Sequence, residues 1–390
     1  MNKLPVKSAG AARLRRGHPW VFSNEVLGRV PDLEPGEIVE VVDGQDFYLG
    51  TAYVNRHSLI LARILSWRRE PIDRGFFVQR IARALALRTQ LYPGSTSYRL
   101  IYGEGDGLPG LVVDRYGDAL VVQAHTLGMD LRLEQIVDSL EEVLHPEIIV
   151  ERNDLPVRSL EGLSPRKGIL RGALSTPVFV KEGEVRFEVD LLEGQKTGFF
   201  FDHRESRAAF ANLAGEGEVL DLFCYAGAWG LMAAMAGAKR VTFVDNSTHA
   251  MELAQRNARL NGLSGKCEFL KDEALDAMRD LDRRDRRFNA IVLDPPAFVK
   301  SKKHLAEGLR GYRNLNARAI GFLADGGILA SSSCSYHVSW DLFEGVMADA
   351  VGRGRRRATV LYRGGQPPDH PVPLLLPEAA YLKCMIMRIE

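Results

Sequence analysis

The 390-residue chain has few cysteines, no long hydrophobic run and almost no net charge. Its four cysteines show no C-x-x-C spacing and no paired histidines nearby, which excludes a zinc cluster and a disulfide framework and predicts no bound metal. No window of about 18 uncharged apolar residues occurs, so no transmembrane helix is expected. The N-terminal stretch MNKLPVKSAGAARLRRGHPW lacks the apolar centre of a secretory signal. These absences predict a cytoplasmic protein.

The composition that is present, 46% hydrophobic and 26% charged, is typical of a soluble globular protein, and the length favours two or three domains. The formal net charge of +1 conceals an asymmetry. Residues 1–100 contain 15 lysines and arginines against 9 acidic residues, whereas the remainder contains 36 against 41. A basic N-terminal part on a slightly acidic chain favours a polyanionic partner.

The first half of the chain predicts two small bodies. Three short β-rich runs within residues 36–66 are separated by turn residues and indicate a small antiparallel barrel or sheet. A helix, a strand, a hairpin through Tyr116-Gly117-Asp118, a second helix and a strand follow between residues 73 and 153, which indicates a compact α+β unit. Residues 154–180 are rich in proline, glycine and charge and resemble a connecting region.

From residue 186 onward, apolar runs alternate with helical patterns. Near-continuous apolar strands separated by helices predict a parallel α/β sheet covered on both faces, which binds ligands at the carboxyl ends of its strands. The predicted domains are therefore residues 1–72, 73–185 and 186–390. The predicted strands of the last domain are EVLDLFCY, RVTFVDNS, CEFLKD, NAIVLDPPA and GGILASSSCS.

Three of these strands end in an acid: Asp221, Asp245 and Asp272. The loop after the first strand, CYAGAWG, does not have the G-x-G-x-x-G spacing that binds a dinucleotide pyrophosphate. A carboxylate at Asp221 attracts a cationic amino or sulfonium group, Asp245 suits two ribose hydroxyls, and Asp272 suits an adenine edge. Taken singly, each acid also fits a helix cap or a turn. Together they favour S-adenosylmethionine over NAD as the cofactor.

The motifs LDLFCYAGAWGL, VDNSTHAMELAQRNARLNGL, KDEA and IVLDPPAFVKSKK resemble those of class I methyltransferases. The upstream segment GQKTGFFFDHRESR resembles that of the RlmI-like family of large-subunit ribosomal RNA methyltransferases, which form 5-methylcytosine. AARLRRGHPWVFSNEV resembles the start of the family's PUA domain, and GQPPDHPV with YLKCMIMRI resembles its C-terminal strands. The resemblance implies a PUA-like β-barrel that grips rRNA, a central α+β domain and a Rossmann-like catalytic domain.

The resemblance also implies a set of cofactor-binding residues. The upstream segment would close over the methionine end of S-adenosylmethionine, and the strand-end motifs would hold the rest of the molecule. The implied residues are Gln195, Thr197, Phe200, Asp202, Arg204, Asp221, Phe223, Tyr225, Gly227, Asp245, Asn246, Asp272, Glu273, Ala274, Asp294 and Pro295.

Cys334 follows the predicted strand GILASSS. The neighbouring predicted strand ends in Asp294. Cytosine C5 is a poor nucleophile, and a thiolate that adds at C6 makes C5 nucleophilic. Asp294 can hydrogen-bond the N3/N4 edge of the base. The family carries its nucleophile at the position of Cys334, so we expect Cys334 and Asp294 to be catalytic. Alternatively, Cys334 only fills a strand end; Cys224 is the second candidate, although it fits better as a packed small residue.

Two further groups of residues are candidates for RNA contact. FVKSKK places three lysines beyond the DPP turn, where they could bind phosphates, and the N-terminal segment mixes basic and aromatic side chains. Both groups also fit a solvated surface. The candidate substrate-binding residues are Pro296, Phe298, Lys300, Lys302, Lys303, Arg13, Arg16, His18 and Trp20.

The sequence therefore predicts methylation of cytosine C5 in 23S rRNA. Two alternatives stay open: an rRNA methyltransferase that acts on a purine nitrogen without a nucleophilic thiol, and a non-catalytic RNA-binding assembly factor. The family resemblance also allows a homodimer, which no residue pattern decides.

Overall fold

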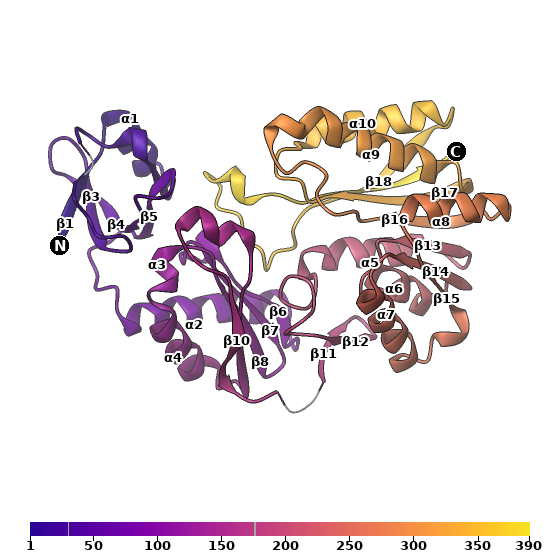
Figure 1. Cartoon of the computed structure of the whole chain (residues 1–390), viewed down its shortest axis with the longest axis horizontal. Helices are drawn as coiled ribbons and strands as arrows, with labels where there is room; N and C mark the ends of the chain where they lie inside the picture. The colour runs from indigo at the N-terminus through magenta and orange to yellow at the C-terminus, as the bar shows by residue number, and fades with distance from the viewer. Residues whose placement is uncertain (30, 175–176) are drawn as a thin grey trace. The chain divides into compact units, whose positions relative to one another are not determined.

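The computed structural model describes residues 1–29, 31–174 and 177–390, and the chain forms two compact units. The first unit contains Met1–Val178, Asp190–Gly198 and Pro368–Ala379, and the second contains Phe179–Val189, Phe199–Pro367 and Ala380–Glu390. Figure 1 labels their helices and strands. Among the described residues, no helix has both the length and the hydrophobicity that spanning a membrane requires, and no cluster of three metal-ligating side chains occurs.

The first sheet of the first unit has five strands in the order β1-β3-β4-β5-β2. The three β-rich runs predicted in residues 36–66 are confirmed as β3, β4 and β5, which pair antiparallel. The sheet is not wholly antiparallel, because β1 pairs in parallel with β3. Alternate residues such as Leu4, Val39 and Ile64 fill the core beneath α1. The bounds are β1 (Asn2–Pro5), α1 (Ser8–Arg15), β2 (Trp20–Phe22), β3 (Ile38–Val42), β4 (Tyr48–Val54) and β5 (Ile60–Ser66).

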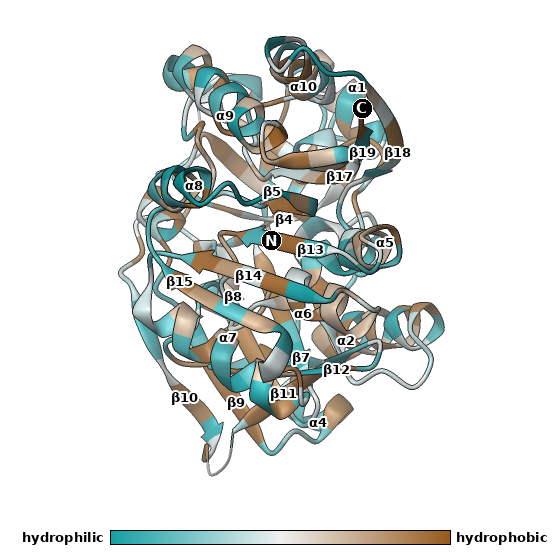
Figure 2. Ribbon diagram, turned by 90° about the vertical axis from the view of Figure 1, so that its right-hand side faces the viewer, coloured by the Kyte–Doolittle hydropathy of each residue, from teal (hydrophilic) through white to brown (hydrophobic). Residues whose placement is uncertain are grey.

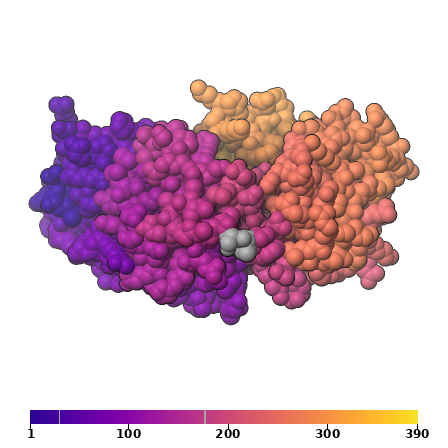
Figure 3. Space-filling model, turned by 60° about the horizontal axis from the view of Figure 1, so that its bottom comes forward, coloured from indigo at the N-terminus to yellow at the C-terminus, as the bar shows by residue number. Residues whose placement is uncertain are grey.

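The second sheet of this unit has the order β10-β9-β8-β7-β6, and the predicted hairpin and helices are confirmed. Asp73 begins α2 by accepting a hydrogen bond from the Phe76 backbone N–H. The residues that form these two sheets belong to the part of the chain coloured indigo to magenta in the space-filling view (Figure 3). The bounds are α2 (Arg74–Leu91), β6 (Ser97–Tyr102), β7 (Leu111–Tyr116), β8 (Ala119–Ala124), α3 (Leu127–Asp130), α4 (Leu133–Leu144), β9 (Ile148–Asn153) and β10 (Arg166–Gly172).

The connecting region predicted for residues 154–180 is wrong in most of the part that the structure describes. Strand β10 pairs antiparallel with β9, so this stretch adds an edge strand to the central sheet. Strand β11 (Val178–Glu182) begins before the stretch ends and pairs with β12 (Val185–Val189). The charged, glycine-containing sequence RKGILRG concealed the strand because an edge strand tolerates exposed polar residues. Residues 175–176 lie outside the described residues.

The large sheet of the second unit has seven strands in the order β15-β14-β13-β16-β17-β19-β18. Five of them, β13 to β17, are parallel as predicted, whereas β19 runs antiparallel to both β17 and β18. The predicted parallel sheet therefore becomes mixed at one side. The bounds are β13 (Glu218–Leu222), β14 (Arg240–Asp245), β15 (Cys267–Lys271), β16 (Phe288–Leu293), β17 (Leu323–Ser333), β18 (Ala358–Gly364) and β19 (Lys383–Ile389).

Helices cover both faces of this sheet. Its strands are largely hydrophobic, whereas the outer faces of α8 and α9 are hydrophilic (Figure 2). Leu220, Ile291 and Leu329, from neighbouring strands, are fully buried in the shared core. The bounds are α5 (Arg204–Leu213), α6 (Ala228–Met235), α7 (Thr248–Leu260), α8 (Ala274–Arg283), α9 (Leu305–Ile320) and α10 (Trp340–Arg353).

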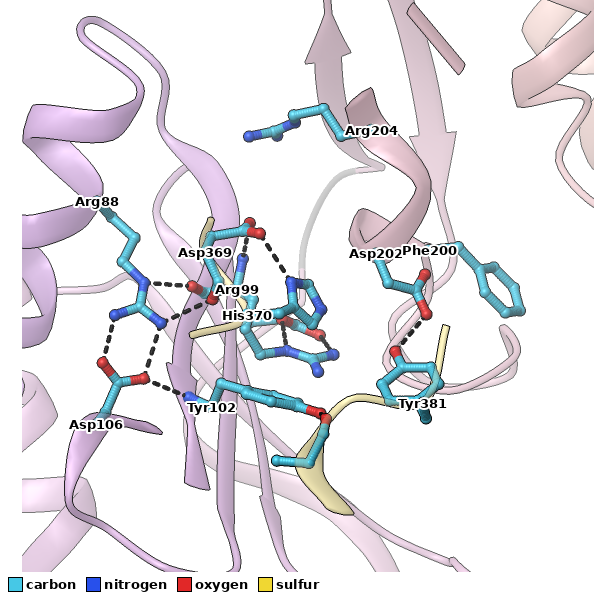
Figure 4. A network of polar contacts seen from close by, with 12 residues as sticks. Arg88, Arg99, Tyr102, Asp106, Phe200, Asp202, Arg204, Asp369, His370 and Tyr381 are labelled. Atoms are coloured by element: carbon cyan, nitrogen blue, oxygen red, sulfur yellow. Dashed lines mark hydrogen bonds and ion pairs between the residues drawn. The ribbon is translucent and has the colours of Figure 1, made fainter. Parts of the chain in front are cut away.

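The stretch GQPPDHPV is not a strand, which corrects the expectation from the family resemblance. It lies in the connection between β18 and β19, and part of that connection, Pro368–Ala379, belongs to the first unit. There the backbone carbonyl of Asp369 accepts a hydrogen bond from Arg88, and its carboxylate accepts one from the backbone N–H of Arg99 (Figure 4). Arg88 also forms a buried ion pair with Asp106 at 2.5 Å. Prolines in this stretch remove strand donors, and the network fixes the connection instead.

Candidate active site

The carboxyl ends of β13, β14, β16 and β17 lie at one edge of the large sheet. Asp221 lies opposite Phe243 of β14 and Val292 of β16, so its side chain is in the middle of the sheet. Leu293 pairs with Ser331, so Asp294 and Cys334 both follow directly after adjacent parallel strands, as the sequence predicts. Side chains at this edge converge on one ligand-binding crevice in open α/β sheets.

The loop between β13 and α6 is conformationally strained. Phe223 and Tyr225 have φ of +65° and +46°, in the left-handed region that non-glycine residues rarely adopt, and Gly227 follows at +77°. The Tyr225 N–H donates to Asp245 Oδ2 at 3.0 Å, and the Cys224 N–H donates to the Val244 carbonyl at 3.1 Å. The strand end of β14 therefore holds the loop in a shape that would be costly by itself.

Asp221 is fully buried. Its Oδ2 accepts a hydrogen bond from the Gly230 N–H at 2.9 Å, whereas Oδ1 is buried without a hydrogen-bond partner among the described residues. Burial raises the pKa of Asp221 to about 8, and the charges of Asp294 and Asp245 raise it further. A buried carboxyl with an unpartnered oxygen, next to a strained loop, fits the ammonium group of S-adenosylmethionine, which would supply the missing donor.

The other predicted cofactor residues form the rim of this edge. Asp245 is half-buried, and its Oδ1 accepts the Ser247 N–H at 3.0 Å, so it also has the turn role that any strand-end acid can have. Asn246 donates to Glu273 Oε1 at 2.8 Å, and Asp272 accepts the Glu273 N–H. Each carboxylate oxygen keeps a further lone pair, so these contacts leave acceptors for hydroxyl or amine groups. Ala274, which begins α8, is buried.

Asp294 is held from two sides. His203 Nε2 lies 3.1 Å from Oδ1, and Trp229 Nε1 donates to Oδ2 at 3.2 Å. Burial alone would raise the pKa of Asp294, but the His203 contact outweighs it and the pKa is lowered. Asp294 is therefore an ionised acceptor, which suits hydrogen bonding to an amino group better than sharing a proton.

Sequence reasoning missed His203 and Trp229. Both lie inside motifs that pointed to the family, FDHRES and AGAWGL, and both are buried. Their aromatic rings pack at 5.3 Å, so each also fits the hydrophobic core. Only the polar groups of these residues could have indicated a site: a histidine stands directly after Asp202, and a tryptophan N–H needs a hydrogen-bond acceptor when it is buried.

The upstream segment is divided between the two units. In the second unit, Phe200 packs on Tyr225 at 5.3 Å, and buried Asp202, in the short 3₁₀ helix η4 (Phe201–His203), accepts a hydrogen bond from the Tyr381 hydroxyl at 2.5 Å (Figure 4). The half-buried Arg204 lies 3.6 Å from Glu182. These residues are thus ordered next to the strained loop. Their contact with the cofactor stays a prediction.

Gln195 and Thr197 belong to the first unit. Gln195 is exposed, and its backbone carbonyl accepts the Gly198 N–H at 2.9 Å. Thr197 is fully buried, and its hydroxyl donates to Asp114 at 2.5 Å and contacts the Tyr116 hydroxyl at 2.9 Å. The hydroxyl of Thr197 already has partners within its own unit.

The four cysteines have different environments. Burial raises the pKa of Cys224 well above its usual value, that of Cys267 to about 11 and that of Cys384 to about 12. Cys224 is buried, in line with the packing role predicted for it, and Cys384 is buried as well, whereas Cys267 is half-buried at the start of β15, away from the carboxyl ends. Cys334 is partly exposed at the carboxyl end of β17. It is the thiol that a ligand at this edge could meet.

The loop after Asp294 presents both packed and exposed residues. Pro295 is buried and Pro296 exposed. Phe298 packs on the ring of Tyr312 at 4.6 Å, so it anchors the loop on α9. The three predicted lysines of this loop are exposed and form no ion pair among the described residues: Lys300, Lys302 and Lys303. Three uncompensated charges next to the crevice suit phosphate groups.

Three of the four N-terminal candidates make internal contacts in the first unit. Arg13 pairs with Glu25 at 2.5 Å, its Nη1 lies 2.6 Å from Nδ1 of His18, and Trp20 Nε1 donates to Glu104 at 2.7 Å. Burial, followed by the charge of Arg13, lowers the pKa of His18. These residues therefore hold α1 and β2 in place.

Arg16, the fourth candidate, is exposed. It lines a surface pocket of about 370 Å³ with Arg15, Tyr48 and Trp67, and the Trp67 side chain is 45% exposed. An exposed aromatic ring beside two arginines suits a stacked base and its phosphates. Trp67 stands in a stretch with Arg68 and Arg69 that repeats the basic and aromatic composition of the N-terminal segment.

Comparisons with known proteins agree with these features. A family model described as a PUA-like domain matches residues 4–67, and one described as an S-adenosylmethionine-dependent methyltransferase matches residues 169–388. In solved structures, a SAM-dependent methyltransferase from Streptococcus mutans aligns with a TM-score of 0.84 at 23% identity, over 100% of both chains. A methyltransferase solved in complex with SAH aligns with a TM-score of 0.85 at 22% identity, also over 100% of both chains. The folds therefore agree over the whole length.

Two relatives are similar in sequence over nearly the whole chain, and both are named ribosomal RNA large subunit methyltransferase I. The protein from Pseudoalteromonas atlantica is 40% identical over 380 residues, which cover 96% of each chain. The protein from Vibrio cholerae is 39% identical over 376 residues, which cover 95% of each chain. The chain therefore belongs to the S-adenosylmethionine-dependent methyltransferases with an N-terminal PUA-like domain, in the family of ribosomal RNA large subunit methyltransferase I.

Proposed function

We propose that this protein methylates C5 of a cytosine in 23S rRNA, with Cys334 as a covalent nucleophile. The names of the relatives support large-subunit rRNA as the substrate. The observation that carries the cytosine assignment is the position of Cys334: a partly exposed thiol directly after β17, beside the strand that ends in Asp294. Methyl transfer to a purine nitrogen requires no such thiol, because a ring nitrogen has its own lone pair.

The chemistry begins with the base, not the cofactor. The Cys334 thiolate adds to cytosine C6, a carbon–sulfur bond forms, and the C5=C6 electron pair moves toward the ring nitrogen N3, which makes C5 nucleophilic. S-adenosylmethionine supplies an electrophilic methyl group. Once C5 carries the methyl group, its proton leaves to a base, the carbon–sulfur bond breaks, and the electron pair returns to the sulfur of Cys334.

Asp294 orients the base in this proposal. Its carboxylate is kept ionised by His203 and has lone pairs to accept the exocyclic amine of cytosine. Uracil carries a carbonyl at that position, which an ionised carboxylate would repel. The contact therefore selects cytosine and holds C6 near the thiol.

Asp221 binds the cofactor ammonium in the same proposal, and Asp245 binds the ribose. The buried Oδ1 of Asp221 gains a charged donor, so cofactor binding offsets the cost of keeping this acid in the sheet. Asp272 and Glu273 meet the adenine from the rim.

The RNA is held by two basic surfaces. The lysines of the loop after Asp294 contact phosphates near the target base, and the pocket of Arg16 and Trp67 binds a second, unpaired part of the RNA. The homodimer that the family resemblance allows stays a prediction.

The test is methyl transfer to a large-subunit rRNA transcript by the full-length protein and by Cys334→Ala, with Cys267→Ala as the matched control. We expect Cys334→Ala to lose turnover by at least about a thousandfold while it still binds S-adenosylmethionine, because the removed nucleophile has no substitute. Cys267→Ala keeps full activity. Mass spectrometry of the digested RNA should identify 5-methylcytosine.

RNA that contains 5-fluorocytosine provides a direct check, since fluorine cannot leave from C5 and the adduct persists. The wild type should form a covalent complex that survives denaturing electrophoresis, and Cys334→Ala should not. Turnover that persists in Cys334→Ala, with a methylated purine in the digest, would favour the purine alternative. Calorimetry without any heat from S-adenosylmethionine would favour a binding factor instead.

A further inference from the structure

Lys383 begins β19 in a position close to Cys334. It pairs with Ser333 in the β17–β19 register, and Ser333 directly precedes Cys334. The Lys383 side chain turns inward: its Nζ donates to the carbonyl of Ser335 at 2.8 Å and to that of Tyr381 at 2.7 Å. The ammonium group is therefore bonded to the residue that follows Cys334.

Among the residues that the structure describes, no carboxylate pairs with the charge of Lys383. Only 4% of the residue is exposed, and no acidic group of the described residues lies within ion-pair distance of its Nζ. Burial lowers the pKa of Lys383 to about 8, and the charge of Cys334 raises it. A buried lysine without an anion is costly, so its position next to a thiol indicates a role.

We propose that Lys383 is a positioning residue that stabilises the thiolate of Cys334. This inference rests on the proposed function of Cys334 as a nucleophile. The attraction between the two charges is mutual. The thiolate raises the pKa of Lys383, and by the same free energy the ammonium lowers the pKa of Cys334. Only the thiolate attacks a pyrimidine at a useful rate.

Lys383 keeps its proton throughout the proposed reaction. Its two hydrogen bonds to carbonyl groups fix the ammonium in place, so no proton is exchanged with the cysteine or the base. Cys334 is a thiolate before it adds to C6 and again after elimination. The ammonium group of Lys383 stabilises the thiolate at both stages. Lysine thus supplies a fixed charge and not a proton.

Other titratable groups near Cys334 do not supply a fixed positive charge. Tyr312 on α9 has its pKa raised by burial and, in addition, by Cys334, so it is neutral near pH 7. Asp294, at the end of β16, is an anion. Further titratable side chains on these elements include Cys384 on β19, whose pKa is raised by burial, and Tyr336 and His337 on the loop of Cys334 itself.

The experiment measures the reactivity of Cys334 in the full-length protein, without RNA or cofactor. Iodoacetamide alkylation is followed at Cys334 by peptide mass spectrometry between pH 5 and 10, in the wild type, Lys383→Met and Lys383→Arg. We expect Lys383→Met to raise the apparent pKa of Cys334 by at least one unit, which lowers the alkylation rate at pH 7 about tenfold. Lys383→Arg should retain the wild-type rate at pH 7, since it keeps the charge.

The matched control is Lys239→Met, because Lys239 is exposed just before β14, at the opposite end of the sheet. Its alkylation profile should equal that of the wild type. The inference would be overturned if the alkylation profile of Lys383→Met equalled that of the wild type. It would also be overturned if Lys383→Arg showed the slower alkylation at pH 7 that we expect for Lys383→Met. If Lys383→Met does not fold, as judged by circular dichroism, Lys383→Gln takes its place as the variant without the charge, with the same expected shift.

The outcome is separable from that of the proposed function. Should Cys334→Ala keep full methyl transfer, the proposed mechanism fails whatever the alkylation profiles show. Should Lys383→Met lose methyl transfer while its Cys334 profile is unchanged, the covalent mechanism stands and the role assigned to Lys383 is wrong.

Discussion

Replacing Asp221 with asparagine should stabilise the protein and weaken its cofactor binding at the same time. The carboxyl of Asp221 is fully buried, and its pKa rises from 3.8 to about 8. In the unfolded chain the group ionises above about pH 4, whereas in the folded protein it stays protonated until about pH 8. The unfolded state therefore binds fewer protons in this window, and stability falls as the pH rises through it.

The size of the effect follows from the pKa shift. Each pH unit in the window costs about 1.4 kcal/mol, so at pH 7 the wild type has lost about 4 kcal/mol relative to a group that cannot ionise. The asparagine amide places a buried N–H group where Oδ1 has no partner, which costs roughly 1–2 kcal/mol. We therefore expect Asp221→Asn to be more stable at pH 7 by about 2–3 kcal/mol, from the difference of these two amounts.

Urea unfolding of the two proteins at pH 5, 6, 7 and 8 measures this difference, which should grow with pH. Calorimetry should show S-adenosylmethionine binding weakened at least about tenfold, the loss of one charge-assisted hydrogen bond. Asp325→Asn is the control, since the Asp325 side chain is 93% exposed and should give no pH-dependent difference. A stability difference that is absent at pH 7, or that does not change with pH, would refute the reasoning.

Three further outcomes are expected. His203→Ala removes the contact that lowers the pKa of Asp294, so the acidic limb of the kcat profile should move to higher pH; a profile that keeps its position would show that Asp294 does not need to be ionised. Trp67→Ala should weaken binding of the rRNA transcript about tenfold in filter-binding titrations, because one stacked base contributes about 1–3 kcal/mol. If the wild type and Trp67→Ala bound the transcript equally well, the pocket would not be an RNA-binding site. Arg13→Ala should instead lower the melting temperature, since Arg13 pairs with Glu25.

Local patterns predicted the catalytic sheet well, and they failed where exposure conceals a strand. The apolar runs that became β13 to β17 identified both the element type and the edge at which the acids lie. Strand β10 was missed because a charged edge strand has the composition of a loop. The family resemblance implied a strand in the connection that contains Asp369, whereas its prolines disfavour a strand and the network that fixes it joins distant segments of the chain.

At the candidate site, the sequence predicted which residues take part better than it predicted which side chains contact one another. Asp221, Asp294 and Cys334 were each predicted from a strand end. Neither the contact of His203 with Asp294 nor that of Lys383 with the Ser335 carbonyl could be predicted, because both partners come from distant segments of the chain. The sequence made Arg13, His18 and Trp20 candidates for RNA contact. In the structure they form hydrogen bonds or ion pairs with one another and with nearby acids.

The sequence by itself determined the alternation of strands β13 to β17 with helices, the acids that follow these strands, and the thiol among small polar residues, since these depend on spacing and side-chain type within a few residues. Only the tertiary structure decided which carboxyl is protonated, which thiols are buried and which cation lies beside Cys334. Those properties depend on desolvation and on charges brought together across the sheet, and neither is a function of neighbours along the chain.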